Sequence, residues 1–94
     1  MGDFGEVTAW VAANVPKDAR VAAVGYVPVL QLSEMTGRKL IDWHARDANR
    51  ALSHPVYLVT AISPPDPFEV GPVHTRLVMQ SGRARYFVFL IENP

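Results

Sequence analysis

Apolar residues near the N-terminus recur at spacings of three and four, which predicts an amphipathic helix with one apolar face. The residues on this pattern are Phe4, Val7, Val11 and Val15. Asp3, with Glu6 three residues later, resembles a capping box at the start of that helix. The helix should end before Pro16, because a residue that precedes proline is disfavoured in the helical conformation.

The next segment has the pattern of a strand followed by a helix. Residues 21–24 form a short apolar run closed by Gly25, which predicts a strand buried on both faces. Residues 29–36 then predict a helix, with Pro28 in its first turn and Gly37 at its C-terminal cap.

A second unit of the same kind follows. Residues 39–43 predict a short strand, and residues 45–52 predict a polar helix. Residues 56–62 form the clearest strand pattern in the chain, and the proline-rich residues 63–67 that come next indicate a surface loop.

The C-terminal segment predicts a β-hairpin. Residues 75–80 and 83–92 flank Ser81-Gly82, which has the composition of a two-residue connection. Arg83 and Arg85 would then lie on one face of the second arm. The alternative for residues 73–80 is a helix, since Val73, Leu77 and Gln80 would also suit one helical face.

This alternation of helices and strands predicts a single α/β domain over residues 1–94. The expected architecture is a small, Rossmann-like three-layer domain with a mostly parallel central sheet and an antiparallel C-terminal hairpin. At 49% apolar and 19% charged residues, the composition is that of a globular protein. No apolar stretch is long enough to span a membrane, and no N-terminal signal peptide is recognisable.

Charge and cysteine content narrow the classes of partner. The formal net charge is zero, so the basic surface of a nucleic-acid-binding protein is not expected. The chain has no cysteine, which excludes disulfides, cysteine-ligated zinc and a thiol nucleophile. His44, His54 and His74 show none of the spacings that place two imidazoles on one metal ion, so no metal site is expected.

Gly25 and Tyr26 follow the first predicted strand, at the edge where α/β sheets usually bind ligands. A dinucleotide fold would need further glycines here to let the backbone approach a pyrophosphate, so no cofactor is expected. Tyr26 is a candidate contact for a ligand or partner, or it simply covers the end of the sheet. Trp10, on the first predicted helix, is either a core residue or a second such contact.

Asp42 and His44 lie on either side of Trp43 and would project to the same face of the second predicted strand. A carboxylate beside an imidazole can orient it as a general base, and Asp47 could reach the same place. These residue types are also ordinary in strand-to-helix connections, and the sequence places no nucleophile beside them. Asp42 and His44 are therefore candidate contacts, and no catalytic residue is assigned.

Residues 7–26 combine a helix, an Asn-Val-Pro end, a short acidic turn, Ala-Arg-Val and a buried strand. This pattern resembles the opening of the extracytoplasmic C-terminal domain of GT-C type membrane glycosyltransferases. That group uses polyprenyl-phosphate sugars and is related to protein mannosyltransferases and aminoarabinose transferases. Residues 37–39 and 54–60 are similar to later strand entries of such domains, whereas residues 75–94 match nothing in them.

The resemblance implies an accessory domain cut from a larger membrane protein, in which the chemistry takes place elsewhere. The family's catalytic aspartate lies in a loop near its first membrane spans, and no position here matches that loop. The resemblance further implies an extracytoplasmic location. It implies a role in packing on the transmembrane part of the parent chain or in guiding the acceptor.

Two other interpretations remain open from the sequence. The chain could be a free-standing α/β module that binds a small molecule or a protein at the carboxyl ends of its parallel strands. It could also be a small enzyme that uses Asp42 and His44. In any of these, the aromatic strand at residues 86–91 could pair with a second copy of the chain if it lies at a sheet edge.

Overall fold

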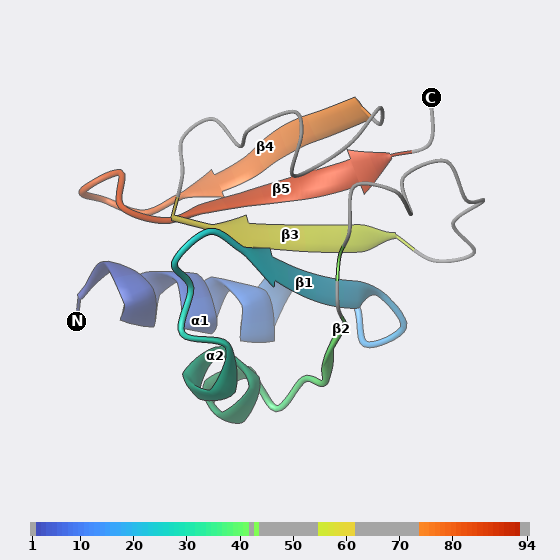
Figure 1. Cartoon of the computed structure of the whole chain (residues 1–94), viewed down its shortest axis with the longest axis horizontal. Coiled ribbons are helices and arrows are strands. Elements are labelled where there is room, and N and C mark those ends of the chain that lie inside the picture. Colours follow the sequence, from blue (N-terminus) through green and yellow to red (C-terminus); the bar gives the residue numbers. More distant parts are fainter. Residues whose placement is uncertain (1, 42, 44–54, 62–73, 93–94) are drawn as a thin grey trace.

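The computed structural model describes residues 2–41, 43, 55–61 and 74–92. Within them the chain forms two helices and a five-stranded mixed sheet, which makes it a small α/β domain (Figure 1). The elements are α1 (Asp3–Asn14), β1 (Arg20–Val24), α2 (Val29–Thr36), β2 (Leu40–Ile41), β3 (Val56–Thr60), β4 (His74–Gln80) and β5 (Phe87–Glu92).

The strand order in the sheet is β2-β1-β3-β5-β4. β1 pairs in parallel with β2 and β3, whereas β5 pairs in antiparallel fashion with β3 and β4. Residues 74–80 are therefore a strand and not a helix. β1 is flanked on both sides, which agrees with the buried strand predicted from residues 21–24. The registers place Ala22 beside Leu58 and Leu58 beside Phe89, so these side chains share one face of the sheet.

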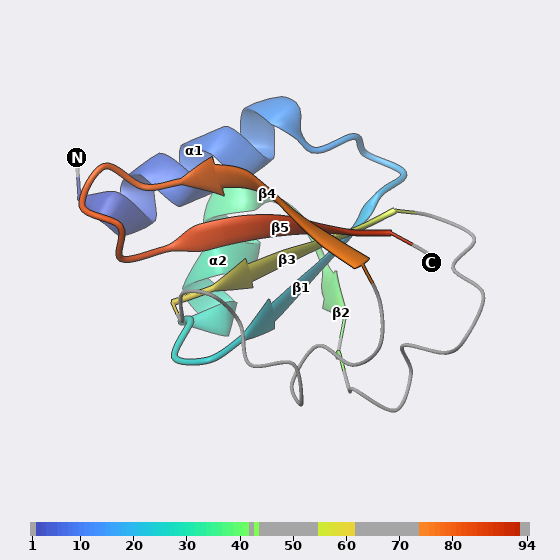
Figure 2. The ribbon, with the colours of Figure 1, turned by 90° about the horizontal axis from the view of Figure 1, so that it is seen from above.

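Both helices lie on the same face of the sheet (Figures 1 and 2), where one apolar cluster joins them to the strands. The buried residues of that cluster are Val7, Val11, Val15, Ala19, Val21, Leu32, Val59 and Val88. The predicted apolar face of α1 is thus confirmed. Leu32 anchors α2 with no exposed surface, and burying one leucine side chain stabilises a fold by roughly 1.5–3 kcal/mol.

The opposite face of the sheet is apolar as well. A second cluster there contains Ala22, Leu58 and Phe89, together with Trp43 just after β2. The sheet is therefore buried on both faces. The described part of the chain has its helices on one face of the sheet only. The polar helix predicted at residues 45–52 lies outside the described residues.

The predicted C-terminal ends of the two helices are confirmed, whereas the predicted N-terminal ends are wrong. α1 ends at Asn14 and α2 ends at Thr36, and Gly37, with a left-handed φ of 67°, provides the predicted C-terminal cap of α2. The capping box at Asp3 is wrong, because Gly2 is the N-cap residue and Asp3 is already inside the helix. Pro28 likewise precedes α2 as its N-cap residue rather than lying in the first turn.

Two predictions about the C-terminal hairpin are also wrong. The connection runs over residues 81–86 instead of two residues, so Arg83 and Arg85 lie in a loop and not on a strand face. β5 lies between β3 and β4, with both sides paired, so it offers no free edge to a second copy of the chain. The sheet edges are β2 and β4.

Candidate functional site

The turn between β1 and α2 has an uncommon backbone. Gly25 and Tyr26 both lie in the left-handed region, with φ values of 66° and 59°. Glycine adopts this region freely, but a residue with a side chain does so at a cost. The turn is tied to the sheet by a 3.2 Å hydrogen bond from the Ala61 N–H to the Gly25 carbonyl. It therefore lies where the parallel strands β1 and β3 both end.

This turn presents apolar side chains to solvent. Tyr26 is 90% exposed, Leu30 is 80% exposed and Val29 is 47% exposed. Of the two roles left open for Tyr26, this exposure favours contact with a ligand or partner. We call Tyr26, Val29 and Leu30 the carboxyl-edge surface.

The start of α2 belongs to the same surface. Pro28 is its N-cap residue and makes no side-chain capping hydrogen bond, and the first turn contains no acidic residue. The first N–H groups of a helix have no partner within it, so their partial positive charge faces outward here. The carboxyl-edge surface thus combines apolar side chains with helix N–H donors. It lies at the point of an α/β sheet where the crossover connections diverge, which is the usual ligand position in such folds.

A polar cluster lies at the same end of the sheet, where the parallel strands finish, on the left in Figures 1 and 2. Here the first turn of α1 meets the β4–β5 loop. The Ser81 hydroxyl donates to Asp3 Oδ2 at 2.6 Å, and both side chains are buried. The Arg83 and Arg85 backbone N–H groups donate to the same Asp3 oxygen at 3.0 and 3.3 Å. The Gly82 N–H donates to Glu6 Oε2 at 3.1 Å. We call these contacts the Asp3 clamp.

The Asp3 clamp also fixes the protonation of its carboxylate. The hydrogen bond from the Ser81 hydroxyl lowers the pKa of Asp3, although burial acts in the opposite direction. The backbone N–H groups of Arg85 and Arg83 and the charge of Arg85 lower this pKa further. Oδ2 of the carboxylate accepts three hydrogen bonds from the β4–β5 loop, so we interpret this cluster as one that holds the loop in place.

Of the two predicted site residues that the structure describes, Tyr26 lies on the carboxyl-edge surface and Trp10 does not. Trp10 is half-buried on α1, where its ring packs 6.4 Å from that of Tyr57, so it belongs mainly to the core. Asp42, His44 and Asp47 lie outside the described residues. Within the described ranges, no group of three or more histidine or acidic side chains is arranged to hold a metal ion.

Sequence reasoning missed Val29 and Leu30 as part of this surface. Both fall in a run of apolar residues that reads as the buried face of a short helix, and only Leu32 takes that role. The available signal was Pro28, because a helix that begins directly after the strand turn must leave its first residues at the sheet edge. The pairing of Asp3 with Ser81 was also missed, since the two residues are 78 positions apart in the chain.

No helix in the described part of the chain is long and apolar enough to cross a membrane. No family model matches the sequence, and comparisons with curated proteins and with solved structures find no match either. The functional argument therefore rests on the residues themselves.

Proposed function

We propose that this chain is an accessory, non-catalytic domain of a polyprenyl-phosphate-sugar dependent membrane glycosyltransferase, located on the extracytoplasmic side. In this proposal the carboxyl-edge surface docks on the transmembrane part of the same protein or guides its acceptor. The single observation that carries the docking role is the exposure of Tyr26 and Leu30, at 90% and 80%, on a turn that β3 holds in place.

The physical argument starts from the cost of Tyr26. A non-glycine residue with a left-handed backbone costs about 1–3 kcal/mol, and such residues cluster at binding and catalytic sites. The ring recovers none of that cost through packing, because it is almost wholly in water. A partner that covers Tyr26, Val29 and Leu30 would bury apolar surface and give the conformation a purpose.

The segment that resembles the glycosyltransferase domains contributes a second line of support. Residues 7–26 contain most of α1, the Val15-Pro16 end, β1 and the exposed Tyr26, so the resemblance extends to the first residue of the carboxyl-edge surface. The three-layer, mostly parallel, Rossmann-like architecture is part of the same proposal. It would require a further layer on the face that holds Leu58 and Phe89.

The gene itself provides the test. The reading frame upstream of Asp3 should encode several apolar stretches of about 20 residues, each long enough to span a bilayer. An in-frame stop codon shortly before Met1 would instead mean that no membrane spans precede this domain, and the proposal of a C-terminal domain of a membrane enzyme would be lost.

A second candidate, a free-standing ligand-binding module, is favoured by the position of Tyr26 at the carboxyl ends of two parallel strands. The discriminating measurement is thermal unfolding of the isolated chain against a small-molecule library. A ligand of the carboxyl-edge surface at 100 times its Kd stabilises the folded state by about 2.7 kcal/mol, and Tyr26→Asn should abolish that shift, whereas an accessory domain should show no shift that depends on Tyr26. The small-enzyme alternative requires an activity that His44→Ala abolishes without unfolding the protein.

A further inference from the structure

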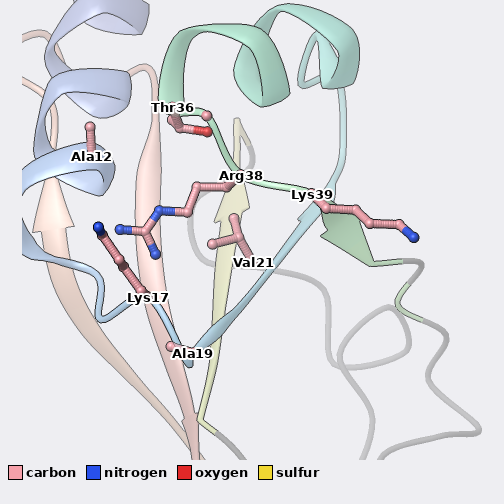
Figure 3. Close-up of a pocket in the computed structure, with 8 residues that line it drawn as sticks. Ala12, Lys17, Ala19, Val21, Thr36, Arg38 and Lys39 are labelled. Carbon is pink, nitrogen blue, oxygen red and sulfur yellow. The ribbon is translucent and has the colours of Figure 1, made fainter.

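A pocket of about 520 Å³ lies at the opposite end of β1 from the carboxyl-edge surface. Its walls come from the second half of α1, the turn that leads into β1, and the C-terminal end of α2 (Figure 3). This volume falls within the range of small-molecule sites. We call it the basic pocket, for the charged residues that line it: Lys17, Arg38 and Lys39.

Positive charge is concentrated here to an unusual degree. The chain as a whole is neutral, yet both of its lysines line this one pocket, and none of the lining residues is acidic. Figure 3 shows Lys17 and Arg38 extending toward each other across the pocket, while Lys39 points away from its rim. Two like charges that face each other repel. An anion bound between them would attract both, which makes the net electrostatic energy of the three charges favourable.

Arg38 is held in this position by the backbone. Its guanidinium donates to the carbonyl oxygens of Val15 and Pro16, at the turn after α1. A guanidinium has five N–H donors, so these two hydrogen bonds leave donors for a further acceptor. The position of the group is thus fixed before any ligand arrives, which reduces the entropic cost of binding.

The backbone beside these cations leaves room for a ligand. Gly37 lies on the pocket wall between Thr36 and Arg38, and a Cβ atom added to it would meet nothing within 4 Å. The last N–H groups of this turn are already used, since those of Gly37 and Arg38 both donate to the Ser33 carbonyl. Recognition of an anion would therefore rest on the side chains of Lys17 and Arg38.

We propose that the basic pocket binds a phosphate group, of a soluble compound or of a lipid headgroup, with Arg38 as the fixed donor and Lys17 as the second positive charge. Lysine acts as a point charge for phosphate, and arginine can bind it through two parallel hydrogen bonds. The site is independent of the carboxyl-edge surface, because the two lie at opposite ends of β1. A negative result for one of these two sites would therefore leave the proposal for the other unaffected.

The test uses the whole chain with inorganic phosphate and pyrophosphate as soluble probes, and vesicles containing phosphatidic acid as a membrane-bound probe. Binding is followed through NMR shifts of the Lys17 and Gly37 amides at fixed ionic strength. Saturable binding of a soluble probe identifies soluble phosphate compounds as the ligand class. Saturable binding only to phosphatidic acid vesicles, and not to phosphatidylcholine vesicles, identifies a lipid phosphate.

Two charge-matched variants distinguish a built site from general attraction. Lys17→Gln should weaken binding about tenfold, the loss expected for one charge-assisted hydrogen bond, and Lys17→Arg should restore it. Arg83→Gln removes the same charge from an exposed loop position at the other edge and should leave binding unchanged. Equal effects of Lys17→Gln and Arg83→Gln, or no saturable binding to any probe, would overturn the proposal.

Discussion

Two turns at the same end of the sheet each hold a non-glycine residue in the left-handed region. They differ in the contacts that surround that residue. Ala84 has a φ of 55° in the β4–β5 loop, and Tyr26 has a φ of 59° before α2. The loop around Ala84 is fixed by the Asp3 clamp, which uses the backbone N–H groups of its neighbours. At Tyr26, one hydrogen bond from β3 holds the turn and the side chain faces solvent.

The difference shows that an unfavourable backbone conformation does not by itself mark a functional site. At Ala84 the fold provides the compensation, because buried polar contacts determine the path of the loop. At Tyr26 the described contacts provide little, and a large apolar side chain stands in water. The same backbone feature is therefore structural in one turn and, in our proposal, a binding feature in the other.

The largest effect on stability should come from removing the Ser81 hydroxyl. Ser81→Ala deletes the donor to Asp3 and the acceptor of the Arg85 and Tyr86 N–H groups, and Ser81 itself is buried. Urea unfolding should show a loss of roughly 1–3 kcal/mol. Ser33→Ala, which removes one hydrogen bond to the Arg38 carbonyl at a half-buried position, is the control and should cost less.

The Asp3 clamp should also make stability depend on pH. The pKa of Asp3 is lower in the folded state than its ordinary value of 3.8, so the carboxylate favours folding at neutral pH. This contribution is present above the unfolded-state pKa and is lost as the pH falls through the folded-state pKa. Asp3→Asn should lower the free energy of unfolding at pH 7 and flatten its decline in acid. An unchanged acid profile in Asp3→Asn would show that other carboxylates cause the decline.

Glycine substitutions should reveal the same backbone cost in both turns. Ala84→Gly and Tyr26→Gly each remove the left-handed penalty of about 1–2 kcal/mol, against an entropic loss of about 0.5–1 kcal/mol. Both variants should therefore be as stable as the parent protein or up to about 1.5 kcal/mol more stable in thermal unfolding. A clear destabilisation of Tyr26→Gly alone would indicate that its side chain does pack within the fold.

The smallest effect on stability is expected from polar replacements on the carboxyl-edge surface. Tyr26→Asn keeps a residue that tolerates the left-handed region, and Leu30→Ser changes a side chain that is 80% exposed. Each should alter the free energy of unfolding by no more than about 0.5 kcal/mol. A loss comparable to that of Ser81→Ala would remove the contrast between the two turns.

What could be predicted from the sequence was local. The spacing of Val7 and Val11 predicted α1, and Gly37 predicted the end of α2, because each signal acts within a few residues. The strand patterns at β1 and β3 were also readable, since these strands are apolar and bounded by turn residues.

What could not be predicted depends on contacts between distant parts of the chain. The β4–β5 loop is longer than its Ser81-Gly82 signal suggests, because Asp3 and Glu6 bind the N–H groups that a tight hairpin would pair differently. The basic pocket brings Lys17 and Lys39 together through the parallel pairing of β1 with β2. No local pattern marks either residue as part of a pocket.

The accessibility of position 26 tests directly whether the carboxyl-edge surface is covered in the parent protein. These 94 residues contain no cysteine, so Tyr26→Cys and Arg83→Cys each provide one maleimide-labelling site in the isolated chain, and any cysteines of the parent protein outside this domain are first replaced by serine. Labelling rates are compared between the isolated chain and the whole parent protein in its native membrane. If the carboxyl-edge surface docks as proposed, labelling at position 26 should be at least about tenfold slower in the parent protein, since a covered thiol reacts only when the contact opens. Labelling at position 83 should not change. Equal rates at position 26 in both settings would contradict the proposed docking.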